Sequence, residues 1–82
     1  MINIRDKAAL VAFGKHLKQI RQSKKLTLEQ LANSADIEIS QVHRIEMGKV
    51  NTTLSTLISL SKALSMPLSE LTDFVLPKEK AK

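Results

Sequence analysis

Residues 27–48 read TLEQLANSADIEISQVHRIEMG, and this stretch decides the fold that the sequence predicts. Thr27 followed by Gln30 is a capping-box pattern, which is typical of a helix N-terminus. The apolar residues that follow recur at helical spacing: Leu28, Leu31, Ala32 and Ala35. The stretch therefore begins with a short helix that buries one face.

A second short helix is predicted after a break at about Asp36 and Ile37. Its inward residues are Val42 and Ile45, and it ends at Gly48, the usual residue for a left-handed helix stop. Two short helices a few residues apart, the second with polar side chains facing outward, form a helix-turn-helix unit. An ordinary helical hairpin stays open as the alternative, because short antiparallel helices are common in small bundles.

The sequence on both sides of this unit predicts three more helices. The first runs from about Asp6 to Ser23, with an apolar stripe at Leu10, Phe13, Leu17 and Ile20. Thr53 can cap the fourth helix, whose predicted inner stripe is Leu54, Leu57, Ile58, Ser61 and Leu64. Pro67 opens the fifth, with an inner face of Leu68, Leu71 and Val75. The pattern predicts an all-α fold of five helices, with one domain over residues 1–76 and a mobile basic tail over residues 77–82.

Composition limits the classes of function. With 82 residues, one core and one domain are expected, and the absence of cysteine excludes a disulfide framework and a thiolate metal site. No stretch approaches the roughly 18 apolar residues that span a bilayer, and the first ten residues lack the order of a signal peptide. We expect a soluble, cytoplasmic protein. A net charge of +5 suits an anionic partner without identifying it.

Residues 27–32, residues 39–48 and the Leu54-x-x-Leu57 spacing together resemble the phage-repressor-like, or XRE (Cro/C1-type), helix-turn-helix family. The match runs from about Phe13 to Leu71, and its most specific element is Ile-Glu-x-Gly at 45–48. The resemblance implies a five-helix, lambda-repressor-like domain with the helix-turn-helix at helices 2 and 3. It also implies sequence-specific binding of double-stranded DNA by a transcriptional regulator, with the third helix in the major groove.

On that resemblance, the base-contacting positions are Ile39, Ser40, Gln41, His43 and Arg44. Arg44 can donate two hydrogen bonds to guanine, Gln41 could pair with adenine, and Ser40 could contact a base or a phosphate. Ile39 could touch a thymine methyl group, or it could pack against the neighbouring helix. His43 is expected on the surface and not as a metal ligand, because His16 lies on another predicted helix. No metal and no cofactor are predicted.

Phosphate contacts are expected near helix ends, where free N–H groups and a positive dipole favour anions. The candidates are Lys24, Lys25, Thr27, Lys49, Asn51 and Thr52. The resemblance further implies a structural salt bridge between Arg21 and Glu46.

Three positions depart from the family pattern. Leu28 replaces a frequent glutamine, Asp36 stands where glycine is common in the turn, and Glu38 stands where serine or threonine usually caps the third helix. Glu38 beside the groove would be repelled by phosphate, unless it accepts from a cytosine amino group. These departures predict weaker DNA affinity than is usual for the family.

Family members commonly bind as two-fold dimers on inverted repeats, so a homodimer is the expected working form. Phe74, Val75 and Leu76 are candidate dimer contacts, with Leu10 and Val11 as a second choice. Alternatively, Phe74 closes the core of a single chain. Phage repressors, restriction-modification controllers and antitoxins all remain possible settings.

The main alternative function is a protein-binding helical adaptor, or an antitoxin component that acts through a partner protein. An enzyme is not expected, because the two histidines are distant in sequence and the carboxylates are scattered over predicted outer faces. No ligand-sensing domain and no membrane association are predicted.

Overall fold

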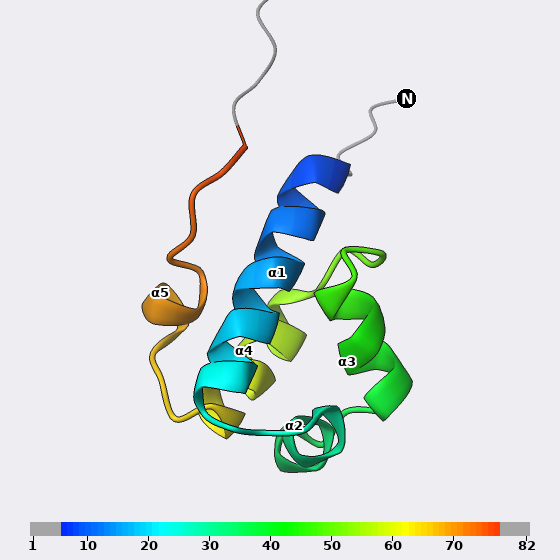
Figure 1. Ribbon diagram of the computed structural model, residues 1–82, viewed down its shortest axis with the longest axis vertical. Coiled ribbons are helices and arrows are strands. Elements are labelled where there is room, and N and C mark those ends of the chain that lie inside the picture. The colour runs from blue at the N-terminus through cyan, green and yellow to red at the C-terminus, as the bar shows by residue number, and fades with distance from the viewer. Residues whose placement is uncertain (1–5, 78–82) are drawn as a thin grey trace, which may run out of the picture.

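The computed structural model describes residues 6–77. These residues form five helices and no strand, in the order α1 (Lys7–Ser23), α2 (Leu28–Ala35), α3 (Ile39–Glu46), α4 (Leu54–Ala63) and α5 (Leu68–Leu71). The long helix α1 runs along the molecule, with α3 on one side of it and α5 on the other (Figure 1). Except for Pro77, the predicted basic tail lies outside the described residues. Within residues 6–77, no helix is long and apolar enough to cross a membrane.

Side-chain caps determine where three of the helices begin. Asp6 accepts from the backbone N–H of Ala9 at the start of α1. At the start of α2, Thr27 accepts from the N–H of Gln30, whose side chain in turn accepts from the N–H of Thr27, so the predicted capping box is confirmed. Thr53 caps α4 by accepting from the N–H of Thr56, as predicted. The caps satisfy backbone donors that have no partner inside the helix.

The core draws residues from all five helices. Its buried apolar members are Phe13, Leu17, Leu31, Ala32, Ala35, Val42, Ile45, Leu60, Leu64 and Leu71. Helix α3 packs against α1 and α2, while α4 packs against α2 and α5. The helix-turn-helix pair is therefore held against α1 and α4 by a single continuous core.

The predicted inner face of α4 was partly wrong. Leu54 is 62% exposed and Ile58 is also exposed, whereas Leu60, which the predicted stripe omitted, is fully buried. Leu57, Leu60, Ser61 and Leu64 follow helical spacing equally well. Packing against α2 and α5 selects this second face.

The predicted extent of the fifth helix was also wrong. Helix α5 begins after Pro67 and ends at Leu71, so Val75 lies beyond it and is 89% exposed. Phe74 turns back toward α1, and its ring lies 5.7 Å from the ring of Phe13 and 5.7 Å from that of His16. Phe74 thus packs against the core of its own chain.

Two glycines allow α1 and the end of α3 to approach closely. A Cβ on Gly14 would lie under 3.0 Å from the carbonyl oxygens of Ile45 and Glu46. Gly48 has a φ of 72°, and a Cβ there would lie under 3.0 Å from Cα of Val11. Both positions exclude a side chain, because backbone atoms cannot rotate away from it.

Candidate nucleic-acid interface

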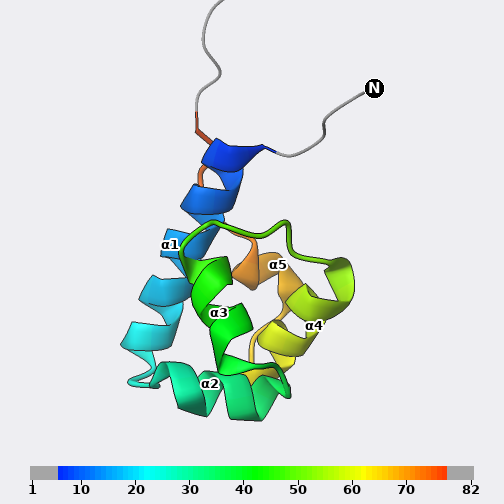
Figure 2. The same cartoon turned by 90° about the vertical axis from the view of Figure 1, so that its right-hand side faces the viewer.

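Helices α2 and α3 and the turn between them form the centre of the candidate site (Figure 2). Asp36 adopts the left-handed conformation with φ 59° and ψ 47°, which accounts for an aspartate at a position that favours glycine. The N–H of Ile37 then donates to the carbonyl of Ala32 at 2.9 Å, closing the end of α2. Val42 and Ile45 are buried and anchor α3, as the sequence predicted.

The five predicted base-reading residues lie on the part of α3 that is not committed to the core. Ser40, His43 and Arg44 are exposed, and Gln41 is half-buried. Ile39 is 48% exposed, so it does not take the alternative role of a core residue. The Nη2 group of Arg44 donates to Oε1 of Gln41 at 3.2 Å. The outward surface of α3 thus presents the cationic side chain of Arg44, several polar donors and acceptors, and the apolar side chain of Ile39.

A buried ion pair ties the end of α3 to α1. Arg21 donates through Nε to Oε2 of Glu46 at 2.6 Å and through Nη2 to Oε1 at 3.1 Å. Its Nη1 donates to the carbonyl of Leu26 at 2.8 Å, in the segment just before α2. The arginine and glutamate side chains are 10% and 3% exposed. This is the pair that the family resemblance implied, and one arginine connects α1, the entry to α2 and the end of α3.

The start of α2 offers features that suit a phosphate group. Lys24 and Lys25 are exposed and immediately precede it, and Thr27 is exposed at its N-cap. The Thr27 oxygen accepts from Gln30, which leaves its O–H free to donate. Positive charge, a hydroxyl donor and a helix N-terminus therefore lie within four residues.

The loop after α3 contains the other three phosphate candidates, and they differ in exposure. Lys49 and Asn51 are exposed. Thr52 does not fit the prediction, because its Oγ1 is buried and has no hydrogen-bond partner among the described residues. A buried hydroxyl cannot reach a phosphate on the surface, so the predicted Thr52 contact is not supported.

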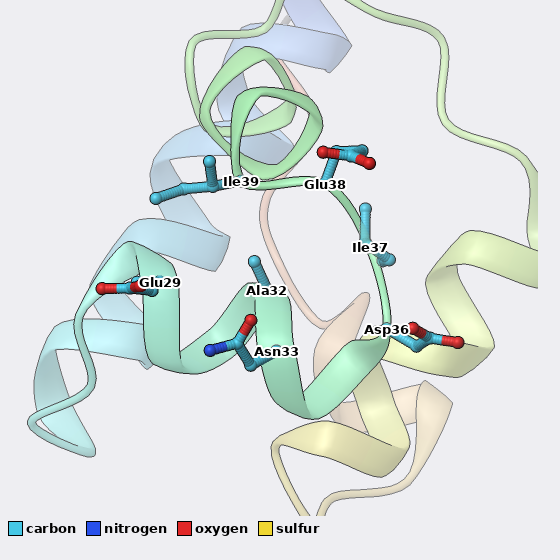
Figure 3. A pocket seen from close by; sticks show the side chains of 7 residues that line it. All are labelled: Glu29, Ala32, Asn33, Asp36, Ile37, Glu38 and Ile39. Atoms are coloured by element: carbon cyan, nitrogen blue, oxygen red, sulfur yellow. The ribbon is translucent and has the colours of Figure 1, made fainter.

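An open groove with a volume of about 400 Å³ lies between α2 and the start of α3. Figure 3 shows Glu29 and Ile39 toward one end and Asp36 toward the other, with Glu38 on the turn above. Three of its lining residues are carboxylates, and Glu38 makes no capping hydrogen bond to α3. Negative charge therefore adjoins the N-terminal half of the candidate reading helix.

The helix-turn-helix family model HTH_3 matches residues 17–71, which include α2, α3, α4 and α5 entirely. The chain belongs to the helix-turn-helix family. This is a family of DNA-binding transcription regulators and not of enzymes. The match confirms the resemblance inferred from the sequence and the all-α, five-helix fold class.

Comparison with individual proteins supports the same assignment. The chain is 35% identical to the restriction-modification controller protein C.AhdI from Aeromonas hydrophila, with a TM-score of 0.74 over 76% of this chain and 94% of that one. It is 36% identical to control protein C.BamHI from Bacillus amyloliquefaciens, over 76% of this chain and 78% of the relative. It is also 39% identical to the immunity repressor protein of Bacillus phage phi105 over 68% of this chain, but the match spans only 39% of that repressor.

Sequence reasoning missed two features of this site. It treated Gln41 and Arg44 as independent readers, although they are three residues apart on a helix and such positions are neighbours. It also noted the charge of Glu38 without recognising that Glu29 and Asp36 line the same groove. The available signal was the spacing of Glu29 and Asn33 on α2 and Asp36 at its C-cap.

Proposed function

We propose that this helix-turn-helix protein binds double-stranded DNA sequence-specifically, as a homodimer on an inverted repeat, with α3 in the major groove. The observation that carries the proposal is the division of α3 into a buried face, Val42 and Ile45, and an outward face that ends in Arg44. A helix anchored in this way can present its side chains to base edges without rearranging. We also propose that the protein acts in the cytoplasm, at the nucleoid.

In this proposal, the outward residues of α3 read bases, and the segments before α2 and after α3 contact the backbone. Arg44 would donate to guanine, and Ile39 would touch a thymine methyl group. Lys24, Lys25 and Thr27 would hold one phosphate region, while Lys49 and Asn51 would hold another. Phosphate contacts would position the protein and base contacts would select the sequence.

Of the three predicted dimer contacts, Val75 and Leu76 remain candidates. The two residues are adjacent, and they are 89% and 65% exposed. Exposure of two adjacent large apolar side chains to water is unfavourable, and a second copy of the chain would cover them. Phe74 instead packs against Phe13 and His16. Val11 is exposed as well, whereas Leu10 is half-buried.

The acidic groove favours a second candidate function, which is binding to a protein partner. Glu29, Asp36 and Glu38 line an open groove that would attract basic side chains and repel phosphate. An adaptor, or an antitoxin-like component, would use this surface in place of the outward face of α3. The two functions predict opposite results in a DNA-binding assay.

The test is selection of bound sequences from a random duplex pool at two salt concentrations, with the wild-type protein and Arg44→Ala. Lys62→Ala is the matched control, since it removes the same charge from an exposed position on α4. We expect an inverted-repeat motif that loses one base preference in Arg44→Ala and stays intact in Lys62→Ala. Failure of the wild type to enrich any motif, with weak and salt-sensitive binding alone, would favour the protein-binding function.

The dimer is tested separately by sedimentation equilibrium of a variant that carries Val75→Asp and Leu76→Asp. We expect a monomer that binds a half-site and no longer requires the inverted repeat. A variant with Leu54→Asp and Ile58→Asp serves as control, because it places the same charges on the exposed face of α4. If only this second variant becomes monomeric, the dimer contact lies on α4 and the C-terminal contact is wrong.

A further inference from the structure

The hydrogen bond between Arg44 and Gln41 links two residues that were each expected to read a base. Nη2 of Arg44 donates to Oε1 of Gln41 at 3.2 Å, across three residues of α3. Arg44 is exposed, whereas Gln41 is half-buried. The two side chains therefore lie beside each other on the outward surface of α3.

We infer that Gln41 is a positioning residue that orients Arg44, so that the two side chains together read a single base pair and Gln41 reads none of its own. This inference rests on the proposed DNA-binding function, and it replaces the expectation that Gln41 pairs with adenine. It assigns one specificity-determining unit where the sequence suggested two.

The donors and acceptors of the two side chains favour this arrangement. To recognise adenine, a glutamine must accept from the N6 amino group through its carbonyl oxygen while its amide donates to N7. In Gln41 that oxygen already accepts from Arg44, which restrains the plane of the amide. Turning the amide so that both its oxygen and its NH₂ group face adenine would compete with the bond to the guanidinium group.

Arg44 remains equipped to read guanine while it is held. A guanidinium group has five N–H donors in a planar fork, and the bond to Gln41 uses one of them. Two parallel donors remain for guanine O6 and N7. The bond exists in the protein without DNA, so the Arg44 side chain is partly ordered before binding. This lowers the entropic cost of binding the base pair toward which Arg44 is already oriented.

The decisive experiment repeats the selection of bound sequences with Gln41→Ala, Gln41→Glu, Arg44→Ala and the double variant Gln41→Ala with Arg44→Ala. We expect Gln41→Ala to weaken, by about two- to fivefold, the preference for guanine at the same base pair that Arg44→Ala abolishes. The double variant should match Arg44→Ala alone. Gln41→Glu should keep the guanine preference, because a carboxylate accepts from Arg44 but cannot donate to adenine N7.

A result that contradicts the positioning role of Gln41 would appear as a different pattern of base preferences. If Gln41→Ala relaxes a separate base pair and leaves the guanine preference intact, Gln41 reads its own base and the inference is wrong. If Gln41→Glu behaves like Gln41→Ala, the carbonyl oxygen is not what orients Arg44. Absence of any motif with the wild-type protein is a different failure, since it removes the proposed function itself.

A measurement on the free protein tests the pairing without DNA. The ¹⁵N relaxation of the Arg44 Nε–H group reports how restricted the side chain is. We expect its order parameter to fall in Gln41→Ala and to be preserved in Gln41→Glu, with Ser40→Ala as the control on the same helix. An unchanged order parameter in Gln41→Ala would overturn the inference, whatever the selection shows.

Discussion

Replacing Arg21 with alanine should destabilise the protein by about 3 kcal/mol, because it leaves the carboxylate of Glu46 buried without its partner. The substitution removes both hydrogen bonds to Glu46 and the bond to the carbonyl of Leu26. The glutamate side chain is only 3% exposed, so water cannot replace those donors without local opening. The expected loss lies at the lower end of the usual 3 to 5 kcal/mol, since the arginine side chain itself is 10% exposed.

The size of the chain makes this loss easy to measure. A domain of 82 residues has a total stability of about 4 to 12 kcal/mol. A loss of 3 kcal/mol corresponds to a fall in Tm of about 12 to 24 °C for a domain of this size. Urea unfolding followed by far-UV circular dichroism gives the free energy, and thermal unfolding gives Tm. Lys18→Ala is the matched control, because Lys18 is an exposed cation on the same helix.

Two further variants separate the lost charge from the lost packing. Glu46→Gln keeps the shape of the side chain and strands the arginine charge, so it should also be strongly destabilising. A double variant with Arg21→Met and Glu46→Leu leaves no lone charge and should be more stable than either single variant. The reasoning would be refuted if Arg21→Ala fell within about 0.5 kcal/mol of the wild type, the usual range for surface substitutions. The reasoning would also be refuted if the double variant lost as much free energy of unfolding as Arg21→Met and Glu46→Leu lose when their separate losses are added.

Four other substitutions test separate parts of the structure. Gly14→Ala should cost about 1 to 3 kcal/mol in urea unfolding despite the better helix propensity of alanine, because the new Cβ meets carbonyl oxygens at the end of α3; a gain in stability would contradict the close approach. Thr27→Ala and Thr53→Ala should each cost about 1 kcal/mol, since both remove an N-cap. Only the first should also weaken DNA binding in a fluorescence-anisotropy titration, and equal affinities would exclude Thr27 as a phosphate contact. Glu38→Thr should add about 0.5 to 1 kcal/mol by supplying the absent cap, and should tighten DNA binding; unchanged affinity would show that Glu38 lies away from phosphate.

Local rules predicted those features of the fold that depend on a few neighbouring residues. The capping box at Thr27 and Gln30 and the cap at Thr53 follow from side-chain chemistry over three residues. The left-handed stop at Gly48 is equally local, since glycine adopts positive φ without a steric cost. Such features survive in the folded protein because tertiary packing does not compete with them.

The errors occur where the sequence supports more than one packing. Helix α4 has apolar residues on more than one side, so its spacing allowed either a face with Leu54 and Ile58 or a face with Leu60. The neighbours that decide between them, α2 and α5, are brought together only in three dimensions. Helix α5 stops at Leu71, which local spacing did not reveal. Phe74 packs against Phe13, which is the alternative that the sequence left open.

For the candidate site, the sequence predicted which residues lie on α3 but not how they interact. Helical periodicity separates Val42 and Ile45 from the outward residues, and this needs no tertiary information. The burial of the Thr52 hydroxyl depends on how the loop after α3 folds, and the pairing of Gln41 with Arg44 depends on rotamers. Neither is determined by residue type alone.

The polar side-chain contacts that hold α3 and its close approach to α1 are concentrated in its C-terminal half. Glu46 is bound to Arg21, the backbone there lies against Gly14, and Arg44 is held by Gln41. The N-terminal half has no side-chain cap and borders an open acidic groove. Since discrimination between bases needs donors fixed in position, the strictest base preference should come from the C-terminal half of α3. Contacts from the N-terminal half should then tolerate more base substitutions, so relaxed positions in the motif should cluster on that side of the guanine.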